Sequence, residues 1–147
     1  MSLTRREIRE KALQSLFQLS ANKDLTIEEA MQQALTSAED LSDEVEIVSV
    51  PSYLDLLVTG VVEYQAEIDE KIQSHLENWS MDRLAKTDRV IMRIAIFEML
   101  YVPDVPAKVA LNEALEITKL YSDEKSRKFV NGVLANIVNE LEEKEAE

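Results

Sequence analysis

Three arginines in the first ten residues, Arg5, Arg6 and Arg9, are the side chains best suited to bind a ligand. At 100° per residue they continue the apolar face of a helix, so we expect its first two turns to project past the body of the domain. A guanidinium is a rigid fork of donors that holds phosphate oxygens bidentately, which predicts a docking surface. In the alternative interpretation, the arginines lie on apolar surface and pair with the chain's surplus acids. The apolar residues of that face are Ala12, Leu13, Leu16 and Phe17.

A second candidate site is the segment 121–132, which combines a helix end, a polar loop and the start of another helix. Phe129 lies at the edge of the last helix's apolar face, in line with Lys125. An aromatic ring beside lysines can stack an unpaired base, although Phe129 could equally pack in the core. Gly132 inside a helix costs roughly 1 kcal/mol relative to alanine. It therefore indicates the close approach of a neighbour or ligand, or a tight helix crossing.

The amino-acid composition excludes most catalytic and metal-binding sites. The 147 residues contain no cysteine, two glycines and one histidine, His75. They therefore offer no thiolate, no multi-histidine metal site and no glycine-rich phosphate loop. His75 has no carboxylate at a metal-ligand spacing, which favours a surface histidine over a ligand. We predict no catalytic residue, no metal site and no cofactor.

The net charge of −13 argues against nucleic-acid binding, but the distribution of the charged residues along the chain has to be considered as well. Residues 1–20 hold four basic and two acidic side chains, whereas residues 21–80 hold two basic and fourteen acidic ones. Residues 81–147 hold ten basic and thirteen acidic side chains, and five of those acids lie in 140–147. Two patches that are not acidic remain, namely the first helix and the segment 119–128.

The elements that must position these residues are predicted to be helices. Apolar residues make up 46% of the chain, and few glycines and prolines are available for the turns of an all-β fold. Thr4 with Glu7 and Thr26 with Glu29 match capping boxes, and Thr87-Asp88 and Ser122-Asp123 offer further caps. The predicted helices span about 4–20, 27–40, 51–77, a short turn near 80–85, 87–102, 106–120 and 123–143.

The helix over 90–101 is apolar nearly all round, which predicts a central position in the fold. Its two charges, Arg93 and Glu98, lie about 140° apart on the helix and cannot pair with each other. We expect each to find a partner on a neighbouring helix. The chain length fits one domain, and without a signal peptide or a membrane span we expect a cytoplasmic protein.

Five segments in order resemble the NusB family of bacterial transcription antitermination factors. They are RREIREKALQSLF (5–17), DRVIMRIAIFE (88–98), DVP (104–106), LNEA (111–114) and KFVNGVL (128–134). The resemblance implies an all-α fold of two packed helical subdomains, about 1–78 and 79–147, without enzymatic activity. It also implies that the family member binds boxA RNA together with the small-subunit ribosomal protein that acts as NusE. Such a complex would travel with RNA polymerase and disfavour termination, notably in ribosomal RNA operons.

Site residues follow from the same resemblance. Arg5, Arg6 and Arg9 match an RNA-contacting helix, and Tyr121 and Phe129 match aromatic positions near the RNA, with Lys125 beside them. Three positions depart from the family pattern: Glu7 stands where many members are basic, Lys125 where many are acidic, and His75 where an aromatic may meet RNA.

On the partner side, Asp88 and Arg89 match a charged surface that faces the ribosomal protein, and we expect them at the exposed start of their helix. A homodimer of the free protein is possible on this interpretation. Two rival interpretations are a helical adapter that has lost RNA binding and a subunit of an RNA methyltransferase. The second lacks a glycine-rich cofactor segment.

Overall fold

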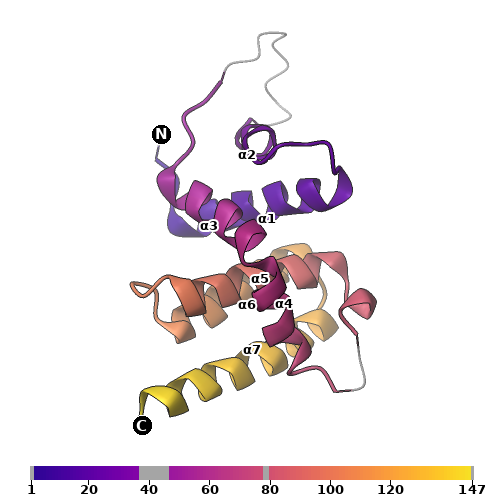
Figure 1. The fold of residues 1–147 in the computed structure, drawn as a ribbon, viewed down its shortest axis with the longest axis vertical. Coiled ribbons are helices and arrows are strands. Elements are labelled where there is room, and N and C mark those ends of the chain that lie inside the picture. Colours follow the sequence, from indigo (N-terminus) through magenta and orange to yellow (C-terminus); the bar gives the residue numbers. More distant parts are fainter. Residues whose placement is uncertain (1, 37–46, 78–79, 147) are drawn as a thin grey trace.

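The computed structural model describes residues 2–36, 47–77 and 80–146, and within these ranges the secondary structure is entirely helical (Figure 1). This confirms the all-α prediction. None of the helices in these ranges is long and apolar enough to cross a membrane. The elements are α1 Arg5–Ala21, α2 Ile27–Leu35, α3 Ser52–Glu63, α4 Gln65–Gln73, the 3-10 turn η1 Met81–Arg83, α5 Lys86–Tyr101, α6 Ala107–Tyr121 and α7 Glu124–Glu145.

Helix starts follow the predicted capping signals with one exception. Both capping boxes form, so the side chains of Thr4 and Thr26 accept the amides of the third helical residues of α1 and α2. Asp123 caps α7 by accepting the Ser126 amide at 2.8 Å. The predicted cap at Thr87-Asp88 is wrong, because α5 begins directly after Ala85 without a side-chain cap.

The predicted helix over 51–77 is two helices, because the chain turns at Tyr64. Its backbone has φ −102° and ψ 16°, outside regular helix geometry. The Tyr64 ring stacks on Tyr101 with a centroid distance of 4.4 Å, which ties the turn to α5. The turn lets α3 pack on α1 while α4 packs on α5. Residues 37–40 of the predicted second helix, and the predicted boundary at 78/79, lie outside the described residues.

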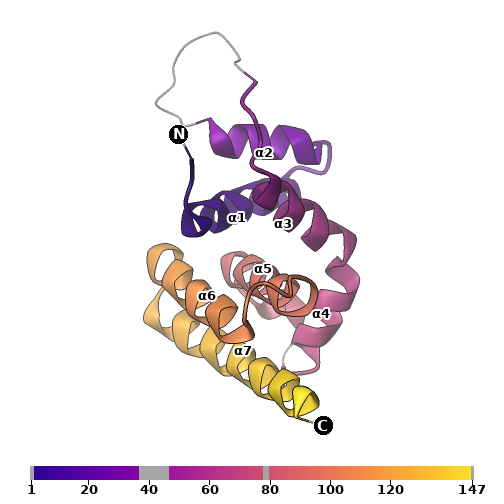
Figure 2. The same cartoon turned by 90° about the vertical axis from the view of Figure 1, so that its left-hand side faces the viewer.

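The central position of α5 is confirmed. It contacts α1, α3, α4, α6 and α7, and its buried residues form most of one face of the core. Arg93 binds Asp69 on α4 at 2.8 and 2.9 Å, and Glu98 binds Arg9 on α1, so each charge has the interhelical partner that we expected. In Figures 1 and 2, α1, α2 and α3 gather at one end of the molecule and α7 lies at the other, with α5 and α6 side by side between them.

Candidate nucleic-acid and partner interface

The three N-terminal arginines do not project past the body of the domain. Arg9 is 5% exposed, and its guanidinium meets the carboxylate of Glu98 on α5 through three contacts of 2.9 to 3.1 Å. The Tyr53 hydroxyl donates to the same carboxylate. Although burial opposes the charge of Arg9, its bonds to Glu98 raise its pKa. The expectation of a free Arg9 is wrong because α1 lies across α5, so the apolar face of α1 stays in the core through these turns.

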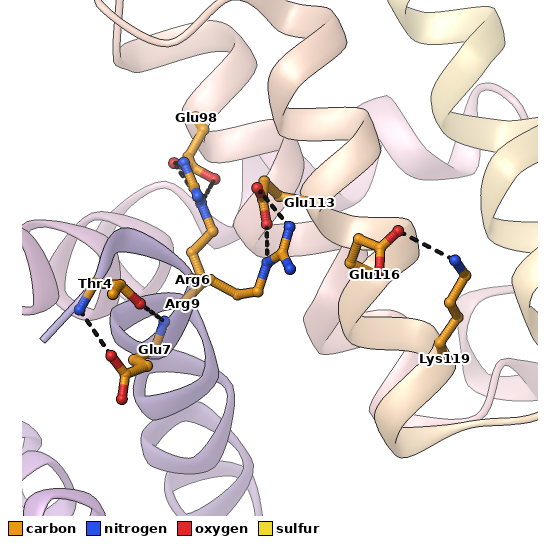
Figure 3. Close-up of polar contacts among 8 residues, drawn as sticks. All are labelled: Thr4, Arg6, Glu7, Arg9, Glu98, Glu113, Glu116 and Lys119. Carbon is orange, nitrogen blue, oxygen red and sulfur yellow. Dashed lines mark hydrogen bonds and ion pairs between the residues drawn. The ribbon is translucent and has the colours of Figure 1, made fainter.

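Arg6 and Arg5 are both exposed, and both are engaged within the chain. Arg6 holds the Glu113 carboxylate on α6, with Nε to Oε2 at 2.8 Å and Nη2 to Oε1 at 3.2 Å (Figure 3). The hydrogen bond from Arg6 lowers the pKa of Glu113. The Arg5 guanidinium carbon lies 3.6 Å from the centroid of the Tyr53 ring, a cation–π contact. The alternative in which the arginines pair with surplus acids is therefore confirmed for Arg6 and Arg9.

A second contact joins α1 to α6, and we call the line between this contact and the Arg6–Glu113 pair the α1–α6 seam. Gln14 donates from Nε2 to the hydroxyl of Tyr121 at 3.3 Å. This pair and the Arg6–Glu113 pair have the same sequence separation of 107, so α1 and α6 run in the same direction along the seam. Eight residues of helix place the two contacts about 12 Å apart.

At the loop end of that seam lies a mostly apolar groove of about 310 Å³, which we call the α1–α6 groove. Phe17, predicted to face the core, is 38% exposed at this groove, and Tyr121 is 41% exposed. Phe17 is exposed because it lies beyond the point where α6 ends at Tyr121, so α6 does not cover this side of the last turns of α1. The lining residues are Leu13, Gln14, Phe17, Gln18, Thr87 and Tyr121.

A second open groove of about 310 Å³, the α5–α7 groove, lies around the start of α7. It brings Lys125 and Phe129 together as the sequence predicted, and Phe129 is half-buried at the groove wall instead of lying fully in the core. The other lining residues are Arg83, Leu84, Ala85, Asp88, Asp123 and Ser126.

The two grooves are neighbours, because Thr87 lines one and Asp88 the other. The Ser122 hydroxyl donates to Asp88 at 3.1 Å, and we call this contact between the grooves the Asp88–Ser122 ridge. The expectation that Asp88 is exposed is wrong, since only 5% of the residue is accessible. It is buried because the loop after α6 folds over the first turn of α5. Arg89 is half-buried and donates from Nη2 to the Leu84 carbonyl at 3.1 Å.

The two remaining sequence candidates have different surroundings. Nothing lies within 4 Å of a side-chain carbon built on Gly132, so the tight helix crossing is wrong. His75 is half-buried, two residues after the end of α4, and its Nε2 lies 2.8 Å from Oε2 of Glu140 on α7. Lys71 binds the other oxygen of Glu140 at 2.5 Å and, together with His75, lowers the pKa of that carboxyl. No cluster in the described ranges has the donors for a metal ion.

Sequence reasoning missed two residues at these surfaces, Glu113 and Arg83, and one residue in the core, Gly60. Glu113 lies in the family motif LNEA, but its position gave no indication that it would pair with Arg6. Arg83 lies on a turn of only three residues, which is too short to show a periodic pattern. Gly60 lies against Phe97, whose ring would be 2.2 Å from an added side-chain carbon. A glycine inside a predicted helix indicates such a close approach, so Gly60 could have been identified from the sequence.

Comparison with known proteins finds relatives along nearly the whole chain. A sequence model described as the NusB family matches residues 6–139. The transcription antitermination protein NusB of Enterococcus faecalis is 60% identical over 143 residues, covering 95% of this chain and 92% of that protein. The protein of the same name from Lactiplantibacillus plantarum is 55% identical over 139 residues, covering 94% and 96%.

Solved structures share the fold. T. maritima NusB superposes with a TM-score of 0.79 at 34% identity, covering 95% of this chain and 94% of that one. A chain from the crystal structure of the antitermination factors NusB and NusE in complex with double-stranded RNA gives a TM-score of 0.74 at 26% identity. That match covers 92% of this chain and 96% of the other.

Proposed function

The chain belongs to the NusB family, and we propose from that membership and from its surface geometry that it is a transcription antitermination protein. It acts by assembly and not by a chemical reaction. It holds single-stranded boxA RNA in nascent transcripts, notably those of ribosomal RNA operons, together with the small-subunit ribosomal protein that acts as NusE. The name shared by its relatives supports the antitermination function, and the solved complex of NusB and NusE with double-stranded RNA supports an assembly with NusE and RNA.

The observation that carries the RNA assignment is the composition of the α5–α7 groove. Lys125 and Phe129, one helical turn apart on α7, line it together with Arg83. A half-buried aromatic ring in an open groove provides a surface on which a base can stack, and the two cations of its lining attract the phosphates on either side. The two aspartates of the lining accept hydrogen bonds from Ser122 and Ser126. Stacking requires unpaired bases, so the groove fits a single strand.

We propose that the RNA continues from this groove over the Asp88–Ser122 ridge to Tyr121 and then along the seam between α1 and α6. The seam leads to Arg6 and Arg5, about 12 Å further on. Both guanidiniums are exposed and can exchange their present contacts for phosphate oxygens. Arg9, buried against Glu98, supports them by holding α1 in place.

The α1–α6 groove suits the protein partner. Its apolar wall at Phe17 offers the aromatic contact that protein interfaces favour. We propose that NusE packs on the Phe17 side while RNA passes on the Tyr121 side, so that the groove is where the two meet. A partner with a basic surface would also offset the acidic residues of the segment 21–80.

One observation favours a rival function, an adapter that binds protein but not RNA. All three N-terminal arginines have intramolecular partners, which reduces the positive surface available to a phosphate backbone. The adapter and the antitermination protein differ in one measurable property, which is RNA binding by the complex with NusE.

The test is fluorescence anisotropy of a labelled boxA oligonucleotide with this protein alone and with NusE added. We expect weak binding alone and tighter binding with NusE. Phe17→Ala should weaken the complex with NusE without changing the melting temperature by more than a few degrees, because its ring is 38% exposed. Absence of boxA binding by the wild-type protein with NusE present would leave the adapter as the function.

Three further properties belong to the same proposal. The complex joins the antitermination assembly on RNA polymerase, which places the protein in the cytoplasm with nascent transcripts. The free protein forms a homodimer that covers part of the RNA surface. Light scattering with and without NusE and the oligonucleotide measures this, since a dimer should convert to a complex containing one copy of each component.

A further inference from the structure

The Glu113 carboxylate on α6 accepts hydrogen bonds from both Nε and Nη2 of the Arg6 guanidinium. The two contacts, at 2.8 and 3.2 Å, form the planar bidentate arrangement in which an arginine also holds a phosphate. The carboxylate therefore occupies one of the bidentate edges at which Arg6 could hold an RNA phosphate, namely the edge formed by Nε and Nη2 (Figure 3).

We propose that Glu113 is a competing carboxylate that RNA displaces from this edge of Arg6, and that it lowers the affinity for boxA and for unrelated single strands alike. The inference rests on the proposed RNA function and adds to it a residue that limits affinity. Without Glu113, Arg6 would offer its full charge to any phosphate backbone that approaches the seam.

The exposure of the pair makes the exchange feasible. The side chains are 52% exposed for Arg6 and 20% exposed for Glu113, so a phosphate can reach the guanidinium while water solvates the released carboxylate. The Arg9–Glu98 pair is the contrasting case, because its side chains are 6% and 1% exposed and opening it would leave a buried charge without a partner. Of these two ion pairs of α1, only the Arg6 pair can therefore be exchanged.

The charge state of the pair suits this competition. The bond from Arg6 lowers the pKa of Glu113, so the carboxylate stays ionised at neutral pH. Glu116, one turn further along α6, also faces solvent but pairs with Lys119 at 3.1 Å. It carries the same charge as Glu113 without occupying the Arg6 fork, which makes it the matched control.

Competition at a phosphate contact acts on all sequences equally. Phosphate contacts position a strand but carry no sequence information, which is read at the bases. Glu113→Gln should therefore tighten the binding of boxA and of a scrambled oligonucleotide by the same factor. Exposed ion pairs change equilibrium constants by at most roughly fivefold, so we expect a gain of about two- to fivefold near 50 mM salt.

Salt dependence gives a second signature. In the wild-type protein, a phosphate that binds Arg6 frees a carboxylate that stays beside the strand. Its negative charge offsets the positive charge of Arg6 and so cancels much of the counterion release from the RNA at this contact. In Glu113→Gln that release is no longer cancelled, so the slope of log affinity against log salt should become steeper by about 0.7. The gain should correspondingly shrink toward no difference between about 50 and 200 mM salt.

The experiment measures anisotropy with boxA and scrambled oligonucleotides, in the presence of NusE, for the wild type, Glu113→Gln and Glu116→Gln. We expect tighter binding of both oligonucleotides only for Glu113→Gln, and loss of that gain in the double variant Arg6→Ala/Glu113→Gln. Unchanged or weaker binding by a folded Glu113→Gln variant overturns the inference, as does an equal gain in Glu116→Gln.

Arg6→Ala alone gives an independent measurement if Glu113→Gln does not fold. Since the competing carboxylate already cancels the ion release at Arg6, this variant should bind more weakly with a slope close to that of the wild type. A slope that is flatter by the full 0.7 contradicts the competition. These outcomes are distinct from failure of the proposed function, in which the wild-type protein with NusE would not bind boxA.

Discussion

Arg9 and Glu98, 89 residues apart in the sequence, form a buried bidentate ion pair that joins α1 to α5. The Tyr53 hydroxyl completes the coordination of the carboxylate, so α1, α3 and α5 meet at one polar contact inside an apolar core. The side chains are 6% and 1% exposed, which makes the contact a part of the fold.

Arg9→Ala should destabilise the protein strongly, because it leaves the Glu98 carboxylate buried without its cation. Breaking a buried pair by removing one partner costs about 3–5 kcal/mol. Chemical denaturation monitored by circular dichroism measures the loss, with Arg6→Ala as the control, because breaking that exposed pair should cost less than about 1 kcal/mol. An Arg9→Ala protein as stable as the control would show that the pair contributes little to the fold.

The two glycines should respond to alanine with opposite signs. Gly60 lies on α3 under the Phe97 ring, which an added carbon would approach to 2.2 and 2.3 Å. Gly60→Ala should therefore destabilise the protein by about 1–3 kcal/mol through overpacking. Gly132→Ala meets open space within its helix and should stabilise by about 0.5–1 kcal/mol. Thermal melts of the two variants provide the comparison, and equal shifts would contradict this account.

Glu113 should contribute to stability in a pH-dependent way. Its pKa is lowered in the folded protein, chiefly by the hydrogen bond from Arg6. A lowered carboxyl pKa gives stability that is present above the ordinary value of 4.5 and is lost as pH falls through the folded value. Urea midpoints of the wild type and Glu113→Gln should differ at pH 7 and converge near pH 3. A constant difference over that range would show that the ion pair is not its source.

Phe129→Ala should weaken boxA binding with little change in salt dependence. A stacked aromatic contact contributes about 1–3 kcal/mol per base and releases few ions. Arg5→Ala provides the contrast, because a lost phosphate contact should flatten the slope by about 0.7. Salt titrations by anisotropy, with NusE present and the fold checked by circular dichroism, measure both variants. A Phe129→Ala variant with wild-type affinity would remove the α5–α7 groove from the RNA path.

Much of the local structure could be predicted from the sequence, because its signals act within one or two helical turns. The capping boxes at Thr4 and Thr26 use residues three positions apart, and both form as expected. The apolar run of 90–101 predicted a central helix, and the isolated charges Arg93 and Glu98 had to find partners elsewhere. Lys125 and Phe129 share a groove because a four-residue spacing places them on one side of α7.

Tertiary structure alone decided which partner each charge found and which surfaces remained open. A helical wheel placed Arg9 and Phe17 on the apolar face, but only the crossing of α1 over α5 buried Arg9 against Glu98, and only the end of α6 left Phe17 exposed. The sequence contains an excess of acids that could each pair with an arginine, and periodicity does not distinguish among them. The choice depends on the angles at which helices pack, which are set by side-chain contacts between residues tens to more than a hundred positions apart.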